Sequence, residues 1–268
     1  MTLRAALFAL GATTLLAAPA AAHRQWMMPS ATVLSGDDAW VTVDAAVSND
    51  LFYFEHQPLR AQPLAMAPDG SAGKIENWAT GRYRSTFDLH LTARGTWKIM
   101  SVNDSVFGSY KLNGVETRLP RGLSPDRLAE AIPAGATDVR TSHNVSRNEI
   151  FVTAGEPTTG VFTPTGKGIE LVPVTHPNDL VAGETASFRF LLDGKPAAGL
   201  PVTIIPGGNR YRDTLNQIDL KTGADGSISV RWPGPGMYWL NVTTDAEPEK
   251  AMPARRASYV TTLEVLAP

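Results

Sequence analysis

The 268-residue sequence contains no cysteine. Disulfide bridges, thiolate metal sites, haem attachment through cysteine and a lipid anchor on cysteine are therefore excluded. Any metal ion must be held by nitrogen, carboxylate or thioether groups. A strong excess of one charge is also missing, because 24 basic side chains are balanced by 26 acidic ones. This balance gives no indication of a nucleic-acid partner.

Long apolar runs are absent except at the N-terminus. There Arg4 precedes an uncharged apolar stretch, 5–18, that is too short to span a membrane as a helix. Ala20, Ala21 and Ala22 supply the small residues that signal cleavage needs. We predict that residues 1–22 are a secretory signal peptide. The mature chain is then expected to lie in the periplasm and not to span the membrane.

The cleavage position decides what chemistry the new N-terminus offers. Cleavage after Ala22 makes His23 the first residue, and its α-amine and ring Nδ1 can then hold one metal ion as a bidentate brace. Cleavage after Ala20 instead produces Ala-Ala-His, in which an amine, two deprotonated amides and an imidazole form the square-planar set that Cu(II) and Ni(II) favour. The alternative without metal is that His23 is simply solvated behind the cleavage site.

Helix signals and catalytic motifs are both scarce. The sequence has no G-x-S-x-G, H-E-x-x-H, P-loop, dinucleotide or EF-hand pattern. We therefore expect a binding protein and not an enzyme. The one helix predicted in the mature chain is 125–131, with Ser124 as its N-cap and Pro125 at its first position.

Short alternating runs of β-branched and aromatic residues, separated by Gly and Pro, predict an all-β fold of two β-sandwich domains. The boundary is placed at the apolar-free segment 163–168, giving an N-terminal domain at 23–163 and an immunoglobulin-like domain at 168–268. The predicted strands are 40–47, 83–91, 96–102, 107–112, 149–153, 169–174, 187–192, 200–205, 217–221, 227–232, 237–243 and 259–265.

Five histidines are the candidate metal ligands, because imidazole is the commonest metal-binding side chain. His56 follows a strand-like aromatic run, 51–55, and is interpreted either as a ligand or as an edge histidine packed on aromatic rings. His176 lies in a Pro-containing turn near the domain boundary, where it belongs either to a hydrogen-bonded turn or to a site between the domains. His90 is expected to be exposed, and His143 is expected in a polar loop.

Several segments carry a resemblance to a known family. They are HRQWMMP at 23–29, DLFYFEH at 50–56, GRYRSTF at 81–87, GTWKI at 95–99, LVPVTHPNDL at 171–180 and GMYWL at 236–240. Together they resemble the DUF4198 family, described as periplasmic components of nickel or cobalt uptake systems. The resemblance implies a β-rich periplasmic protein that begins with Ala-His, and of the histidines it points only to His23. The metal roles of His56 and His176 are inferred from their surroundings.

The sequence therefore predicts a protein that captures Ni(II) or Co(II), with Cu(II) as an alternative, through His23, His56 and His176. It would pass the ion to an inner-membrane transporter or an outer-membrane receptor. Two other functions stay open. One is an envelope interaction module without a metal, since sandwiches commonly bind partners. The other is a copper oxidase that uses a histidine brace.

Overall fold

The computed structural model describes residues 23–36, 38–244 and 254–268. Regular structure in this part is almost entirely β-strand. The exceptions are one helix, α1 (Leu128–Ala131), and three 3-10 turns, η1 (Pro125–Arg127), η2 (Gly160–Phe162) and η3 (Asn209–Tyr211). The all-β prediction is confirmed. In these residues no helix has both the length and the apolar character needed to cross a membrane. The predicted signal peptide, 1–22, lies outside the described residues.

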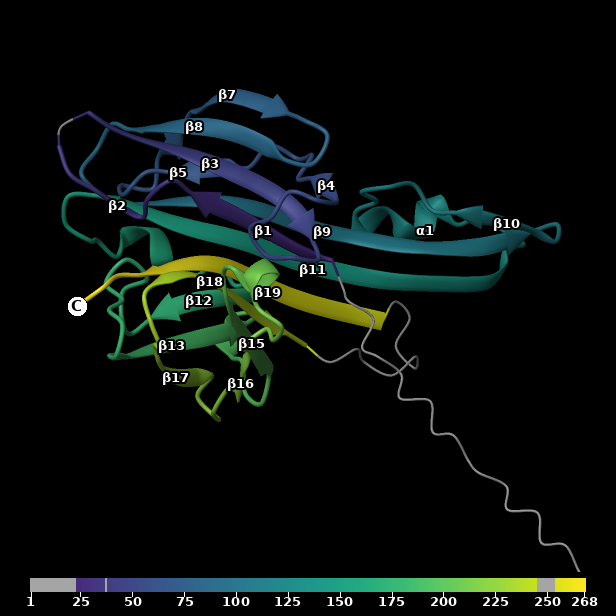
Figure 1. Cartoon of the computed structure of the whole chain (residues 1–268). Coiled ribbons are helices and arrows are strands. Elements are labelled where there is room, and N and C mark those ends of the chain that lie inside the picture. The colour runs from purple at the N-terminus through teal and green to yellow at the C-terminus, as the bar shows by residue number, and fades with distance from the viewer. Residues whose placement is uncertain (1–22, 37, 245–253) are drawn as a thin grey trace, which may run out of the picture.

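Five strands form the upper sheet in Figure 1, with β3 at its centre. β1 pairs with one edge of β3, while β8 and β4 pair with the other. In β8, Phe87 and Leu89 face the core and Asp88 faces outward, as the two-residue alternation predicts. The strands are β1 (Arg24–Pro29), β3 (Ala39–Ser48), β4 (Gln57–Pro58), β7 (Ile75–Thr80) and β8 (Ser85–Leu91).

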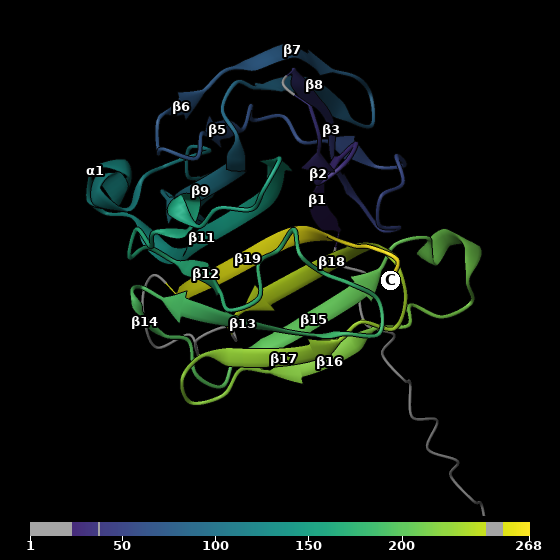
Figure 2. The same ribbon diagram turned by 90° about the vertical axis from the view of Figure 1, so that its left-hand side faces the viewer.

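A ten-stranded sheet runs through the middle of the molecule (Figures 1 and 2). Its two long strands, β9 and β11, pair antiparallel, and the last strand, β19, lies parallel to β11 on its other edge. The C-terminal strand thus joins the first half of the chain to the second. The strands are β2 (Val33–Leu34), β5 (Leu64–Met66), β6 (Ala72–Gly73), β9 (Gly95–Leu112), β10 (Val115–Arg118), β11 (Thr137–Ala154), β15 (Pro201–Pro206), β16 (Ile218–Lys221), β18 (Gly236–Thr243) and β19 (Ala254–Val265).

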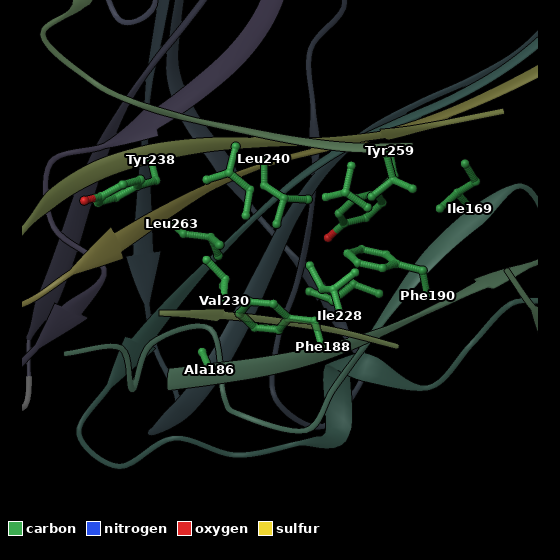
Figure 3. Packing of buried hydrophobic residues seen from close by; sticks show 14 of the residues in the cluster. Ile169, Ala186, Phe188, Phe190, Ile228, Val230, Tyr238, Leu240, Tyr259 and Leu263 are labelled. Atoms are coloured by element: carbon green, nitrogen blue, oxygen red, sulfur yellow. The ribbon is translucent and has the colours of Figure 1, made fainter. Parts of the chain in front are cut away.

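The third sheet packs on the C-terminal half of the central one and completes the immunoglobulin-like sandwich. It consists of β12 (Ile169–Pro173), β13 (Thr185–Leu192), β14 (Lys195–Pro196) and β17 (Ser227–Arg231). Figure 3 shows Phe188 and Phe190 of β13 in the same buried cluster as Leu240 and Tyr259 of the opposing sheet. Burial of these large side chains is the main force that holds the two layers together.

Two further clusters of buried side chains lie between the upper and central sheets. One contains Val41 and Phe87 from above and Trp97 and Ile150 from below. The other combines residues from both halves of the chain, namely Trp26, Ala46, Leu51, Ile205, Trp239 and Val260. The first strand is therefore packed against the second half of the protein.

Several strands are longer than the sequence predicted. The segments 96–102 and 107–112 are one continuous strand, β9, and 149–153 is only the end of the 18-residue strand β11. His143 lies inside β11 and not in a loop. Polar residues interrupt the apolar alternation in these stretches because both strands extend beyond the core as an arm (Figure 1).

The predicted helix and the predicted domain boundary both lie in segments that connect strands. Residues 125–131 do form a short helix, although its first turn is 3-10 and Ser124 makes no side-chain capping bond. The boundary predicted at 163–168 falls between η2 and β12. Strands from both sides of this boundary meet in the central sheet.

Candidate metal site

His23 and His56 lie face to face. Their ring centroids are 3.9 Å apart and the ring planes differ by 1°. His23 immediately precedes β1 and His56 immediately precedes β4, and these strands pair with opposite edges of β3 near its end. The strand pairing of the upper sheet therefore brings together two residues that are distant in the sequence.

Both imidazoles are exposed to solvent. In the stacked orientation their nitrogen lone pairs lie in two parallel planes, because each lone pair lies in the plane of its own ring. Binding one ion between them requires at least one ring to turn about its side-chain bonds. Exposed side chains change rotamer within nanoseconds, so the stack is no obstacle to coordination.

A compact loop positions His56. The Glu55 carboxylate accepts hydrogen bonds from the amides of Asn49 (2.6 Å) and Asp50 (3.2 Å), which closes the turn after β3. Phe52 has a left-handed backbone, with φ of 61°. The strand-like aromatic run 51–55 is therefore not a strand in the structure. The aromatic residues fold back over Trp26 instead of extending. The ring centroids of Phe52 and Phe54 lie 5.5 and 5.6 Å from that of Trp26.

The second half of the protein supports this loop from the other side. Asn209 donates a hydrogen bond to the Asp50 carboxylate at 3.0 Å, and the Arg210 guanidinium lies 3.7 Å from the centroid of the Tyr53 ring. A Cβ at Gly207 would come within 3.0 Å of the Phe52 ring. The close fit at glycine allows the two segments to touch. The pair of histidines thus borders a contact between the two halves of the chain.

His176 does not join them. Its Nδ1 accepts a hydrogen bond from the Asn178 amide (3.0 Å), and its Nε2 lies 3.1 Å from Thr96 Oγ1 and 3.2 Å from the Thr158 carbonyl oxygen. Thr96 pairs with Thr153 at the end of β11, beside β2. His23 lies at the far end of β1, a strand that alone extends over about 20 Å. The structure therefore places His176 in a hydrogen-bonded turn on the opposite side of the fold.

The remaining two histidines have local partners. His90 is half-buried and stacks on Trp40 at 4.4 Å, with its Nε2 2.8 Å from Asp38. His143 Nε2 lies 2.6 Å from the Asp104 carboxylate. Across residues 23–36, 38–244 and 254–268, no three His, Asp or Glu side chains gather closely enough to hold a metal ion. The stacked pair of His23 and His56 therefore has no third side-chain ligand of these kinds beside it among the described residues.

Comparison with known sequences gives the chain a family. The family model described as "Domain of unknown function (DUF4198)" matches residues 20–246. The chain belongs to the DUF4198 family. This confirms the resemblance carried by the sequence segments, while the description names no activity. No curated protein matches the sequence.

Solved structures offer only remote likeness to this DUF4198 protein. The D0-D1 domain of intimin is 12% identical and has a TM-score of 0.24, with 90% of this chain and 97% of that one covered. The human OSCAR ligand-binding domain is 13% identical with a TM-score of 0.23, covering 91% and 100%. The native conformation of E. coli alpha-2-macroglobulin is 14% identical with a TM-score of 0.21, covering 91% and 22%. TM-scores this low support no argument about function.

In this DUF4198 protein, the sequence did not indicate that Asn209 and Arg210 contact the loop that carries His56. Asn209 and Arg210 follow Gly207-Gly208, which marks a turn but not its partner. Asn209 is buried, and its amide oxygen has no hydrogen-bond partner among the described residues. An Asn directly after two glycines indicates a turn in the sequence, and only the structure shows that its side chain contacts Asp50.

Proposed function

We propose that this protein binds one divalent transition-metal ion through His23 and His56. It acts as a non-catalytic periplasmic capture protein that passes Ni(II) or Co(II) to a membrane transport system. The observation that carries the proposal is the direct stacking of the His56 imidazole on that of His23, the first described residue. Histidines are common metal ligands, and two exposed rings this close can enclose one ion after a change of rotamer.

Signal cleavage after Ala22 adds a third nitrogen donor. The freed α-amine and Nδ1 of His23 form a chelate, and the His56 ring supplies the third position. This all-nitrogen set suits Co(II), Ni(II) and Cu(II), and affinity rises in that order. Tight Cu(II) binding in vitro is therefore expected even if nickel or cobalt is the ion that the protein carries. Binding weakens on acidification because protonated nitrogen cannot ligate.

The same donor set supports a second candidate, a copper oxidase with a histidine brace. Its site would leave copper positions open for oxygen. Copper-dependent consumption of peroxide in the presence of a polysaccharide favours this function. Metal capture without turnover favours the transport function.

The test uses protein that has been exported and processed in a periplasm. Native mass spectrometry reports the N-terminus and the bound ion together, and separate titrations with Ni(II), Co(II) and Cu(II) give the affinities. His23→Ala and His56→Ala should each weaken binding by more than about 100-fold, since even indirect changes around a metal cost about 10- to 100-fold. His90→Ala is the matched control, because His90 packs on Trp40 away from the pair.

A second comparison isolates the α-amine. An N-acetylated form of the processed chain keeps both imidazoles but removes the α-amine as a donor, and it should lose most of the affinity. Unchanged binding in both the His23→Ala and the His56→Ala proteins contradicts the proposal. Absence of any bound metal in correctly processed protein favours the envelope interaction function instead.

A further inference from the structure

A second candidate site lies on the arm formed by β9, β10 and β11. Figure 1 shows this arm extending from the rest of the fold. A pocket of about 570 Å³ opens there, within the size range of small-molecule sites. Its walls include Phe107, Ser109, Glu116, Arg118, Leu119 and Arg121. The pocket is formed by residues of the arm and is independent of the proposed metal site.

Backbone hydrogen bonds along β9 fix the segment that forms one wall of the pocket. β10 pairs with β9 so that Arg118 lies opposite Ser109. The chain then continues along the edge of β9, where the Leu119 amide donates to the Gly108 carbonyl at 2.9 Å. The Val106 amide likewise donates to the Leu123 carbonyl at 2.7 Å. Leu119, Leu123 and Val106 are buried together in a small cluster of their own. The segment that carries both arginines is therefore anchored at each end.

Some basic side chains around the pocket have acidic partners, while the two arginines in its wall have none among the described residues. Lys111 pairs with Asp138 at 2.7 Å, and Arg127 pairs with Glu130 at 3.5 Å. The guanidinium groups of Arg118 and Arg121 make no hydrogen bond or ion pair with any residue that the structure describes. The acidic wall residue, Glu116, already accepts a hydrogen bond from the Ser109 hydroxyl at 3.0 Å. Two guanidinium groups thus line one pocket with no partner among the described side chains.

An apolar surface completes the pocket. The Phe107 side chain is 43% exposed, which leaves part of its ring open to a ligand. Guanidinium groups bind carboxylate and phosphate oxygens with paired hydrogen bonds, while an aromatic face favours an apolar group. We infer that this pocket binds a small organic anion, in which an oxyanion group is attached to an apolar body. Arg118 and Arg121 hold the oxyanion, and Phe107 contacts the apolar body.

The test uses the whole mature chain without metal. Phenyl phosphate, benzoate, inorganic phosphate and benzyl alcohol are titrated separately and followed by calorimetry. Phenyl phosphate and benzoate should bind, inorganic phosphate should bind more weakly, and neutral benzyl alcohol should bind weakest. Arg118→Gln and Arg121→Gln should each weaken phenyl phosphate binding about tenfold, the loss expected for one charge-assisted interaction. Phe107→Ala should weaken phenyl phosphate but leave inorganic phosphate unchanged.

The matched control is Arg231→Gln, because Arg231 is an exposed arginine on β17, in a different sheet. It should bind every probe as the parent does. His56→Ala should also bind phenyl phosphate normally, which separates this pocket from the proposed metal site. If the parent binds neither phenyl phosphate nor benzoate, the inference is overturned. Equal phenyl phosphate binding by the parent and the folded Arg118→Gln and Arg121→Gln proteins overturns it as well.

Discussion

Single side chains in this protein take their roles from segments far away in the sequence. His176 is the clearest case. Its neighbours in the chain suggested either a site between domains or a rigid turn, and contacts with Thr96 and Thr158 decide for the turn. Because Nδ1 accepts a hydrogen bond from the Asn178 amide, it carries no proton, and the neutral ring donates through Nε2 to the Thr158 carbonyl.

This arrangement predicts a pH effect on stability. Burial lowers the pKa of His176 below 6.5, against smaller opposing effects of the Thr158 carbonyl and Asp179. The unfolded chain therefore takes up a proton more readily than the folded one. The contribution of His176 to stability is complete above about pH 6.5 and is lost as the pH falls through the lower folded pKa.

The measurement is urea unfolding of the parent and of His176→Gln, repeated at several pH values between about 7.5 and 5. Over this interval the parent should lose more of its free energy of unfolding than the variant, because only the parent carries this ionisable ring. An identical pH dependence in the two proteins contradicts the prediction.

At the level of elements, a buried ionic cluster ties the segment 163–168 to the strands on either side of it. Arg147 of β11 lies 3.0 Å from Glu149 and 3.4 Å from Glu170 of β12. Glu170 in turn accepts hydrogen bonds from the amides of Thr165 and Gly166. Burial raises the pKa of Glu170, but the hydrogen bonds from Thr165 and Gly166, with the Arg147 charge, outweigh it, so the pKa lies below 4.5.

Removing the central charge should destabilise the protein strongly. Arg147→Met removes the cation that lies between two buried carboxylates and leaves Glu149 with only its 3.9 Å pair to Lys98. It is expected to lower the free energy of unfolding by about 3–5 kcal/mol. The matched control is Arg189→Met, which breaks an exposed 3.9 Å pair with Asp225. Such a surface pair contributes about 1 kcal/mol or less. Urea unfolding compares the two variants, and equal losses of stability rule out a special role for the buried cluster.

On the scale of the whole molecule, the two halves of the chain share a sheet and a core. β19 lies between β18 and β11, so the last strand of the second half completes the sheet of the first. Trp26 and Ala46 are buried in the same cluster as Ile205 and Trp239. Separating the halves would expose these side chains and break the ladder between β11 and β19.

The halves are therefore expected to unfold together. Hydrogen exchange measured by mass spectrometry at increasing urea should show β8 of the first half and β17 of the second opening at the same urea concentration. A clearly lower midpoint for either strand contradicts this prediction and indicates two independent units.

Much of this architecture was predictable because it depends on local pattern. Alternation of polar and apolar residues located β3, β8, β13, β15, β17 and β18 to within a few residues. It failed for the arm and for the loop 51–55. In the arm, the strands continue beyond the main clusters and cover only the small one around Val106, so apolar alternation marks them weakly. In the loop, an aromatic run with strand propensity folds back because Trp26 and Gly207 provide a surface for it.

The sequence by itself determined that the protein is all-β, that it has no thiolate, and that His23 is the candidate metal ligand at the predicted mature N-terminus. Those conclusions depend on composition and on neighbouring residues. Only the tertiary structure decided that His56 stacks on His23 and that His176 lies elsewhere. The physical reason is that β3 pairs with β1 on one edge and with β4 on the other, and such pairing depends on the packing of the whole sheet.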